Sequence, residues 1–202
     1  MEKITKIAVT GGIGSGKSEV MKLISALGYY TVSLDEVYAE LLKDEEFVRY
    51  LSNAMGVLPI YEGEKVVLDK KTISKIVFSN KERLNKLNSI THEAIFNKAF
   101  SIHDNGIVFY EVPLLFEGNY QDKFDFIIIV LRDKTERIKA VKCRDGCTES
   151  EVESRINSQF DYEKIDTSLH MIIENNSDLN SLNSQVIKVV KFIEKQIHFT
   201  KN

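Results

Sequence analysis

The sequence predicts an α/β fold in three layers, with a parallel core sheet between two layers of helices. Short apolar runs alternate along the chain with longer segments of helical periodicity. The runs are apolar throughout instead of alternating with polar residues. Strands of that kind are buried on both faces, which is typical of a parallel sheet covered by helices.

Five apolar runs are predicted to be strands, and the third and fourth are the clearest because they are dense in β-branched and aromatic residues. The strand runs are residues 7–9, 29–32, 107–112, 124–131 and 171–173. The helical patterns are residues 17–26, 35–42, 81–102, 135–141 and 179–197. Strands and helices in this order favour βαβ units and therefore a parallel sheet.

Two segments interrupt the alternation and predict the domain organisation. Residues 36–103 are mostly helical, with a turn at residues 61–64, and indicate a helical insertion. Residues 137–164 are charged and rich in helix formers, which favours a moving lid. The predicted core is then made of residues 1–35, 104–136 and 165–202.

Composition narrows the function classes. The 202 residues carry 27 basic and 30 acidic side chains, for a net charge of −3, so nucleic acid is not an expected partner. No apolar run is long enough to span a membrane. The two cysteines, Cys143 and Cys147, fit neither a CxxC pair nor a zinc site, and reduced thiols in the cytoplasm are the expectation. No feature of the sequence specifies an oligomeric state.

A phosphate-binding loop follows the first predicted strand. Residues Gly11–Ser18 read GGIGSGKS and match G-x-x-x-x-G-K-[ST]. Glycines let successive backbone N–H groups converge on phosphate oxygens, and the next helix points its positive end at the same anion. A nucleoside triphosphate with Mg²⁺ is therefore the predicted ligand, with Ser18 as a metal ligand, and the loop alone does not distinguish a kinase from a GTPase or an ATPase. The residues expected to bind it are Gly12, Ile13, Gly14, Ser15, Gly16, Lys17 and Ser18.

Two acidic residues follow other strand candidates. Glu111 closes the run of residues 107–110, where such sites place an acid that holds or orients the metal. The alternative interpretation is a strand-end carboxylate with no role. Asp35 follows the second run and begins a helix. Asp35 has two interpretations at this point, a helix N-cap or the carboxylate that orients and deprotonates an acceptor hydroxyl.

Basic residues gather in the second insertion, where a closing lid would bring positive charge to a phosphoryl group in transfer. A solvated helical hairpin is the alternative interpretation for each of them. The candidates are Arg137, Lys139, Lys142, Arg144 and Arg155.

Several stretches together resemble the dephospho-CoA kinase family, in the family's order and over nearly the whole chain. The loop in residues 8–18 resembles the family's P-loop, and Glu111–Glu117, which reads EVPLLFE, is similar to its most distinctive motif. Residues 144–146 and 155–159 resemble its lid. Residues 172–175 resemble its last strand and the asparagine that ends it.

The resemblance implies a P-loop kinase that transfers the ATP γ-phosphate to the 3′-hydroxyl of dephospho-CoA. It implies that Asp35 is the catalytic base and that Arg144 contacts the phosphates. It also implies that Asn175 contributes to nucleotide binding. The helical insertion would bind the acceptor. The residues expected on the acceptor side are Asp35, His92, Glu111, Pro113, Leu114, Leu115 and Phe116.

The chain also departs from the family's pattern, and two other functions stay open. The departures are Ser33 for Asp, Glu19 for Thr, Lys70 for Arg, Glu93 for Pro, Ala140 for Arg and His170 for Asp. One alternative is a P-loop kinase for a nucleotide or another small alcohol. The other is a nucleotide-binding protein that has lost activity. A GTPase is disfavoured because no Asn-Lys-x-Asp motif is present.

Overall fold

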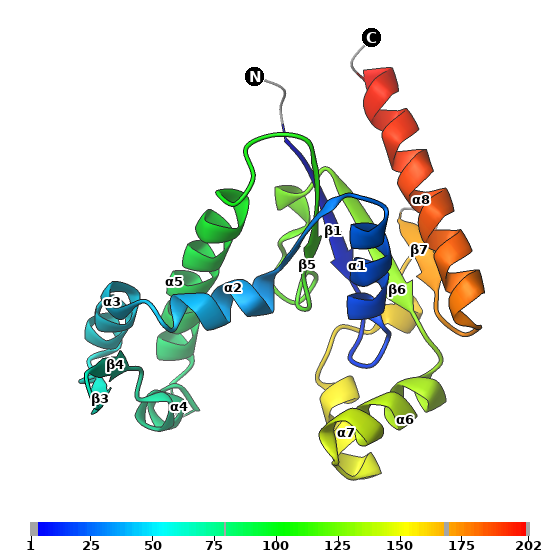
Figure 1. The fold of residues 1–202 in the computed structure, drawn as a ribbon. Helices are drawn as coiled ribbons and strands as arrows, with labels where there is room; N and C mark the ends of the chain where they lie inside the picture. The colour runs from blue at the N-terminus through cyan, green and yellow to red at the C-terminus, as the bar shows by residue number, and fades with distance from the viewer. Residues whose placement is uncertain (1–3, 79, 168–169, 201–202) are drawn as a thin grey trace. The chain divides into compact units, whose positions relative to one another are not determined.

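The computed structural model describes residues 4–78, 80–167 and 170–200, and a sheet of five parallel strands is its central feature (Figure 1). The strand order is β2-β5-β1-β6-β7. The strands are β1 (Thr5–Thr10), β2 (Tyr30–Ser33), β5 (Ile107–Glu111), β6 (Phe126–Leu131) and β7 (Met171–Glu174). This arrangement confirms the predicted parallel core sheet, including its last strand, β7.

The register brings the carboxyl ends of the strands to one edge. Val9 of β1 lies opposite Glu111 of β5, and Thr10 lies opposite Ile129 of β6. Leu131 at the end of β6 pairs with Glu174 at the end of β7. Residues that follow these strands are therefore placed close together, which is where ligands bind in open α/β sheets.

The sheet is buried on both faces, as its uninterrupted apolar strands predict. Ile7 and Val9 belong to a large apolar cluster, and Ala8 between them is also fully buried. Helices α1 (Lys17–Ala26) and α8 (Leu179–Thr200) contact each other and cover the face of the sheet that carries Ile7 and Val9 (Figure 1). Burial of this cluster is the main driving force for folding of this part of the chain.

The chain divides into two compact units, which we call unit 1 (Met1–Ser33 and Asn105–Asn202) and unit 2 (Leu34–Asp104). Unit 1 holds the sheet with α1 and α8. It also contains the short 3₁₀ helices η1 (Gln121–Lys123) and η2 (Tyr162–Lys164), and the helical pair α6 (Lys134–Asp145) and α7 (Glu149–Asn157). The pair packs around Ile138, Val141 and Val152.

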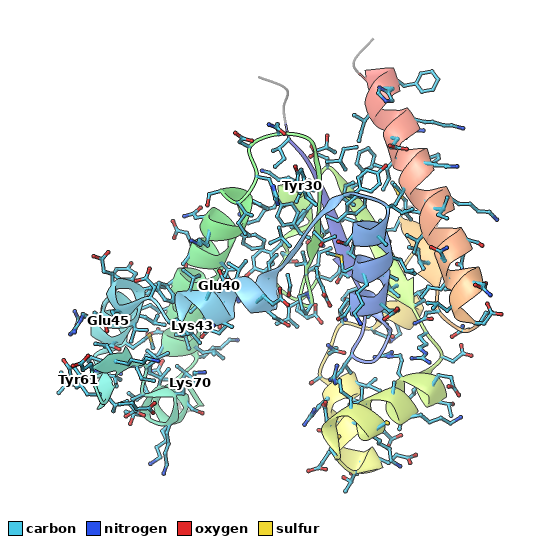
Figure 2. The ribbon with its side chains drawn as sticks, in the orientation of Figure 1. Tyr30, Glu40, Lys43, Glu45, Tyr61 and Lys70 are labelled. Carbon is cyan, nitrogen blue, oxygen red and sulfur yellow. The ribbon has the colours of Figure 1, made fainter. Side chains whose placement is uncertain are left out.

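Unit 2 is a helical body with a small hairpin. Its helices are α2 (Leu34–Leu41), α3 (Glu45–Met55), α4 (Lys70–Phe78) and α5 (Lys81–Phe100). Strands β3 (Ile60–Glu62) and β4 (Lys65–Val67) pair antiparallel around Gly63, whose φ of 65° suits a tight hairpin turn. Figure 2 shows the exposed side chains of Tyr61 on the hairpin and Lys70 at the start of α4. Val48, Leu51 and Met55 of α3 lie in the unit's own apolar cluster.

Two local features differ from the sequence-based expectation. The predicted turn at residues 61–64 is part of a hairpin, in which residues 63–64 connect β3 to β4; these strands are too short for a period-2 pattern to be visible. Helix α6 extends four residues beyond the predicted 135–141 pattern, because Gly146, with a φ of 65°, ends it instead. Within the described residues, no helix combines the length and apolar character needed to cross a lipid bilayer.

Candidate functional site

The predicted phosphate loop joins the end of β1 to the start of α1. Gly14 and Gly16 adopt φ values of 76° and 96°, in the left-handed region that side chains rarely enter. A Cβ on Gly16 would lie 2.1 Å from Nδ2 of Asn175, so the position has no room for a larger residue. Gly16 is also the N-cap of α1 and leaves the helix without a side-chain cap. The first turn of α1 is therefore open to an anion.

Lys17 turns back over the loop. Its Nζ donates to the carbonyl oxygens of Gly11, at 2.8 Å, and Gly12, at 3.1 Å. Only 9% of Lys17 is exposed, so this positive charge is held inside the loop. The hydroxyl of Ser15 is also buried, and it has no hydrogen-bond partner among the described residues. An ammonium and an unused donor in one concave loop fit a phosphate group.

Ser18 and Glu111 form the polar pair beside the loop. The Oγ of Ser18 donates to Oε1 of Glu111 at 3.1 Å. Glu111 is placed there because it lies opposite Val9, two residues before the loop begins. A hydroxyl oxygen next to a carboxylate oxygen is a donor set that suits Mg²⁺, which takes few protein ligands and keeps waters and phosphate oxygens. No group of three acidic, histidine or cysteine side chains among the described residues offers another metal site.

Asn175 and Arg137 contact the loop from two other elements. Nδ2 of Asn175, the residue after β7, donates to the Ser15 carbonyl at 2.9 Å. Nε of Arg137, on α6, donates to the Ile13 carbonyl at 2.9 Å, and its guanidinium lies against Gly12. Arg137 is only 8% exposed. Arg137 is one of the five basic candidates predicted from the sequence, but only Arg144 was predicted to contact phosphates. The contact between Arg137 and the loop was therefore not predicted.

Arg144 lies near the end of α6 and is exposed. It forms a two-point ion pair with Asp145, with Nε and Oδ1 2.7 Å apart. Arg155 of α7 reaches the same carboxylate at 2.8 Å. The hydrogen bonds from Arg144, with those of Arg155, hold the pKa of Asp145 below its usual value. Arg144 and Arg155, two of the three arginines of the predicted lid, are therefore held together by one acid.

The Glu111–Glu117 segment makes a tight turn after β5. Leu115 is completely buried and Leu114 is exposed, so the turn presents one of its two leucines to solvent. The ring of Phe116 stacks on Phe160, with centroids 4.7 Å apart. Glu117 accepts the backbone N–H of Phe160 at 2.9 Å. The distinctive motif thus packs against the segment that follows α7.

Asp35 and His92, the two candidate acceptor-side residues in unit 2, have different surroundings. Asp35 lies in the first turn of α2 and is exposed. No described residue hydrogen-bonds its carboxylate, and α2 begins one residue earlier, at Leu34, so Asp35 is not the N-cap. This leaves the carboxylate available for another role. His92 lies within α5, and its burial lowers its pKa below the usual value.

A cavity of about 260 Å³ lies beside the loop in unit 1. Its lining includes two buried donors, Oγ of Ser15 and Nε of Arg132. Neither donor has a hydrogen-bond partner among the described residues. It is lined by Gly12, Ser15, Val130, Leu131, Arg132, Asp133, Lys134, Arg137, Tyr162, Glu174 and Asn176. Its contact with the loop makes it suited to the part of a nucleotide that extends beyond the phosphates.

Comparison with known proteins decides the family. The family model of dephospho-CoA kinase matches residues 5–181, which include the loop, the EVPLLFE turn and the residues after β7. This chain belongs to the dephospho-CoA kinase family. The dephospho-CoA kinase of Streptococcus pyogenes serotype M3 is 32% identical over 188 residues, covering 89% of this chain and 93% of the relative.

Solved structures agree with this family and with the P-loop kinase fold. The dephospho-CoA kinase of Campylobacter jejuni has a TM-score of 0.65 and 25% identity, covering 96% of this chain and 98% of that one. The shikimate kinase of Bacteroides thetaiotaomicron has a TM-score of 0.51 and 12% identity, covering 94% and 98%. The second likeness shows the fold alone. The predicted α/β P-loop fold and the family resemblance are both confirmed.

Proposed function

We propose that this chain transfers the γ-phosphate of ATP to the 3′-hydroxyl of dephospho-CoA, giving coenzyme A and ADP. The observation that carries the proposal is the family match over residues 5–181, which spans the loop and the turn after β5. The geometry of the loop supports it. Lys17, Ser15 and the open first turn of α1 form an anion site, and the Ser18–Glu111 pair lies directly beside it.

The nucleotide side of the proposed site is built around charge neutralisation. When bound, Mg²⁺ would supply positive charge to the β- and γ-phosphates, with Ser18 as its ligand and Glu111 beside it. Lys17 and the loop amides would hold the same phosphates. Asn175 would fix the loop from the end of β7 through its bond to Ser15. Arg144 would leave Asp145 and contact the phosphates when the lid, residues 137–164, closes.

The acceptor side is assigned to unit 2 and to the turn after β5. Asp35 would orient the 3′-hydroxyl and take its proton, a role that suits an exposed carboxylate without a hydrogen-bond partner among the described residues. Leu114, Pro113 and Phe116 would contact the acceptor, and the buried Leu115 would support them from behind. His92 is the candidate contact on α5. The insertion of residues 36–103 would be the acceptor domain.

The proposal also locates the reaction in the cytoplasm. Cys143 and Cys147 are both free thiols in the structure, and the reducing cytoplasm keeps thiols in that state.

The position of the new phosphate tests the proposal. The purified protein is incubated with Mg·ATP and dephospho-CoA, and the product is analysed by phosphorus NMR and mass spectrometry. We expect a single product phosphorylated at the 3′-oxygen, and no product from an analogue that lacks the 3′-hydroxyl. Phosphorylation at another hydroxyl, or turnover of the deoxy analogue, would contradict the proposal.

A further inference from the structure

Tyr162 contacts the phosphate loop at the point where the loop leaves the sheet. Its hydroxyl lies 3.1 Å from Oγ1 of Thr10, the last residue of β1. Thr10 directly precedes Gly11, the first residue of the loop. The side chain comes from η2, 152 positions after Thr10 in the chain.

The surroundings of Tyr162 fix its hydroxyl in place. Only 5% of the residue is exposed. Phe116 and Phe160 meet its ring edge-on, with centroids 5.9 Å and 5.3 Å away. Burial raises the pKa of the phenol to about 12, so the hydroxyl keeps its proton at neutral pH and can both donate and accept. Thr10 is itself fully buried, so water does not compete for this contact.

The segment that carries Tyr162 holds the loop at a second point. Oε1 of Gln159 accepts the backbone N–H of Ile13 at 2.7 Å. The Ile13 side chain packs against the apolar cluster of α6 and α7. Tyr162 and Gln159 therefore hold the chain at Thr10, directly before the loop, and at Ile13 within it. Tyr162 also lines the cavity beside the loop.

We infer that Tyr162 is a positioning residue for the nucleotide, whose hydroxyl holds the start of the phosphate loop in the shape that receives the phosphates. The inference rests on the proposed function only in taking the loop to bind ATP. A loop fixed before the ligand arrives loses less conformational freedom on binding, so removal of the hydroxyl should weaken nucleotide binding. The loss of one hydrogen bond that orders the loop corresponds to about a fivefold weaker affinity.

Tyr162→Phe removes only the hydroxyl, and Tyr29→Phe is its matched control. The Tyr29 hydroxyl donates to Oε1 of Glu194 at 2.5 Å, and burial likewise raises its pKa to about 12. Tyr29 precedes β2, at the amino end of the sheet and away from the loop. Both substitutions should lower the Tm by a few degrees, because each removes one hydrogen bond that a tyrosine hydroxyl makes in the folded state. They should differ in nucleotide binding.

Calorimetric titration with Mg·ADP measures the affinity without any acceptor, so the result is independent of which substrate is phosphorylated. We expect Tyr162→Phe to bind about fivefold more weakly than the wild type, with the KM for ATP raised by a similar factor and kcat changed less than twofold. Tyr29→Phe should bind like the wild type. Wild-type affinity in Tyr162→Phe, or an equal loss in both variants, would overturn the inference.

A double-mutant cycle with Thr10→Val gives a second test. Valine keeps the shape of threonine but removes its hydroxyl, so it removes the same contact from the other side. We expect the double variant to bind Mg·ADP about as weakly as Tyr162→Phe alone, because the two changes remove one shared interaction. Fully additive losses would overturn the inference, because they would mean that the two hydroxyls act separately.

Discussion

Ser18 and Glu111 are 93 residues apart in the sequence and 3.1 Å apart in the fold. Their meeting follows from the parallel pairing of β1 and β5, which sets Glu111 beside the first residues after β1. The pair is the strongest candidate for binding Mg²⁺ at this site, and this assignment makes a direct prediction.

We expect Glu111→Gln to lower kcat by at least about tenfold at low Mg²⁺ and to raise the Mg²⁺ concentration needed for half-maximal rate, because a neutral amide is a poorer neighbour for the metal. The measurement is turnover as a function of Mg²⁺ concentration. Glu117→Gln is the control, since its amide oxygen can still accept the Phe160 N–H. The assignment fails when Glu111→Gln and Glu117→Gln show the same Mg²⁺ dependence.

Asp35→Asn tests the proposed base. An amide cannot take a proton, so we expect turnover to fall by a factor of about 10² to 10⁴ with Mg·ATP affinity unchanged. Asp44→Asn is the matched control, because Asp44 is an N-cap in unit 2 and asparagine caps a helix equally well. Rapid-quench kinetics and nucleotide titration check both variants. Near-normal turnover in Asp35→Asn would remove the residue from the reaction.

Some residues of the site were predictable one by one and others were not. The loop could be read because its chemistry is local, in consecutive glycines, a lysine and a serine. Arg137, Gln159 and Tyr162 contact the loop through tertiary packing, and nothing in the sequence separates Arg137 from the other basic residues of α6. The burial of Leu115 beside the exposed Leu114 likewise depends on how the turn after β5 is oriented.

The helices beside the site differ in how well their ends could be predicted from the sequence. The prediction of α1 at residues 17–26 coincides with the structure, because a glycine loop begins it and Gly28, with a φ of 92°, follows its end. The helices of the predicted lid were harder to delimit, since α6 and α7 are joined by only three residues and both are highly charged. Thr148 and Glu151 form a capping box that starts α7, a signal present in the sequence.

Gly16→Ala tests the loop as an element. The new methyl group would meet Asn175 at 2.1 Å in a backbone conformation with a φ of 96°, so we expect at least tenfold weaker Mg·ADP binding. Gly28→Ala is the control, because its φ of 92° imposes similar backbone strain but nothing lies within 4 Å. It should lower stability by about 1 kcal/mol and leave binding unchanged. Equal binding by the two variants would contradict the account of the loop.

The whole chain is organised so that every strand end contributing to the site lies on one edge of the sheet. The order β2-β5-β1-β6-β7 sets β1, which carries the loop, between the strands that end at Glu111 and Leu131. The alternation of apolar runs and helices predicted a parallel sheet. It could not predict the strand order, which depends on long-range pairing and not on local pattern.

Stability at high pH tests the burial of tyrosines across the molecule. Burial raises the pKa of Tyr110 and Tyr162 to about 12, against 10.0 for a free phenol. Between about pH 10 and pH 12 the unfolded chain therefore loses these protons while the folded chain keeps them. The folded state then binds more protons, so the free energy of unfolding should fall as the pH rises through this window.

Urea unfolding at several pH values from 8 to 12 measures this effect. Other groups also titrate in this range, so Tyr162→Phe serves as the comparison and should show a smaller fall than the wild type. A free energy of unfolding with the same pH dependence in both proteins would mean that Tyr162 is not buried in the way the structure describes.

The central claim is that this chain is a kinase for dephospho-CoA. It is tested most directly by ADP release measured with dephospho-CoA, nucleoside monophosphates and pantetheine compounds as alternative acceptors. The account predicts rapid, Mg²⁺-dependent ADP release with dephospho-CoA and background rates with every other acceptor. Background rates with all acceptors, or a higher rate with a nucleoside monophosphate, would contradict it.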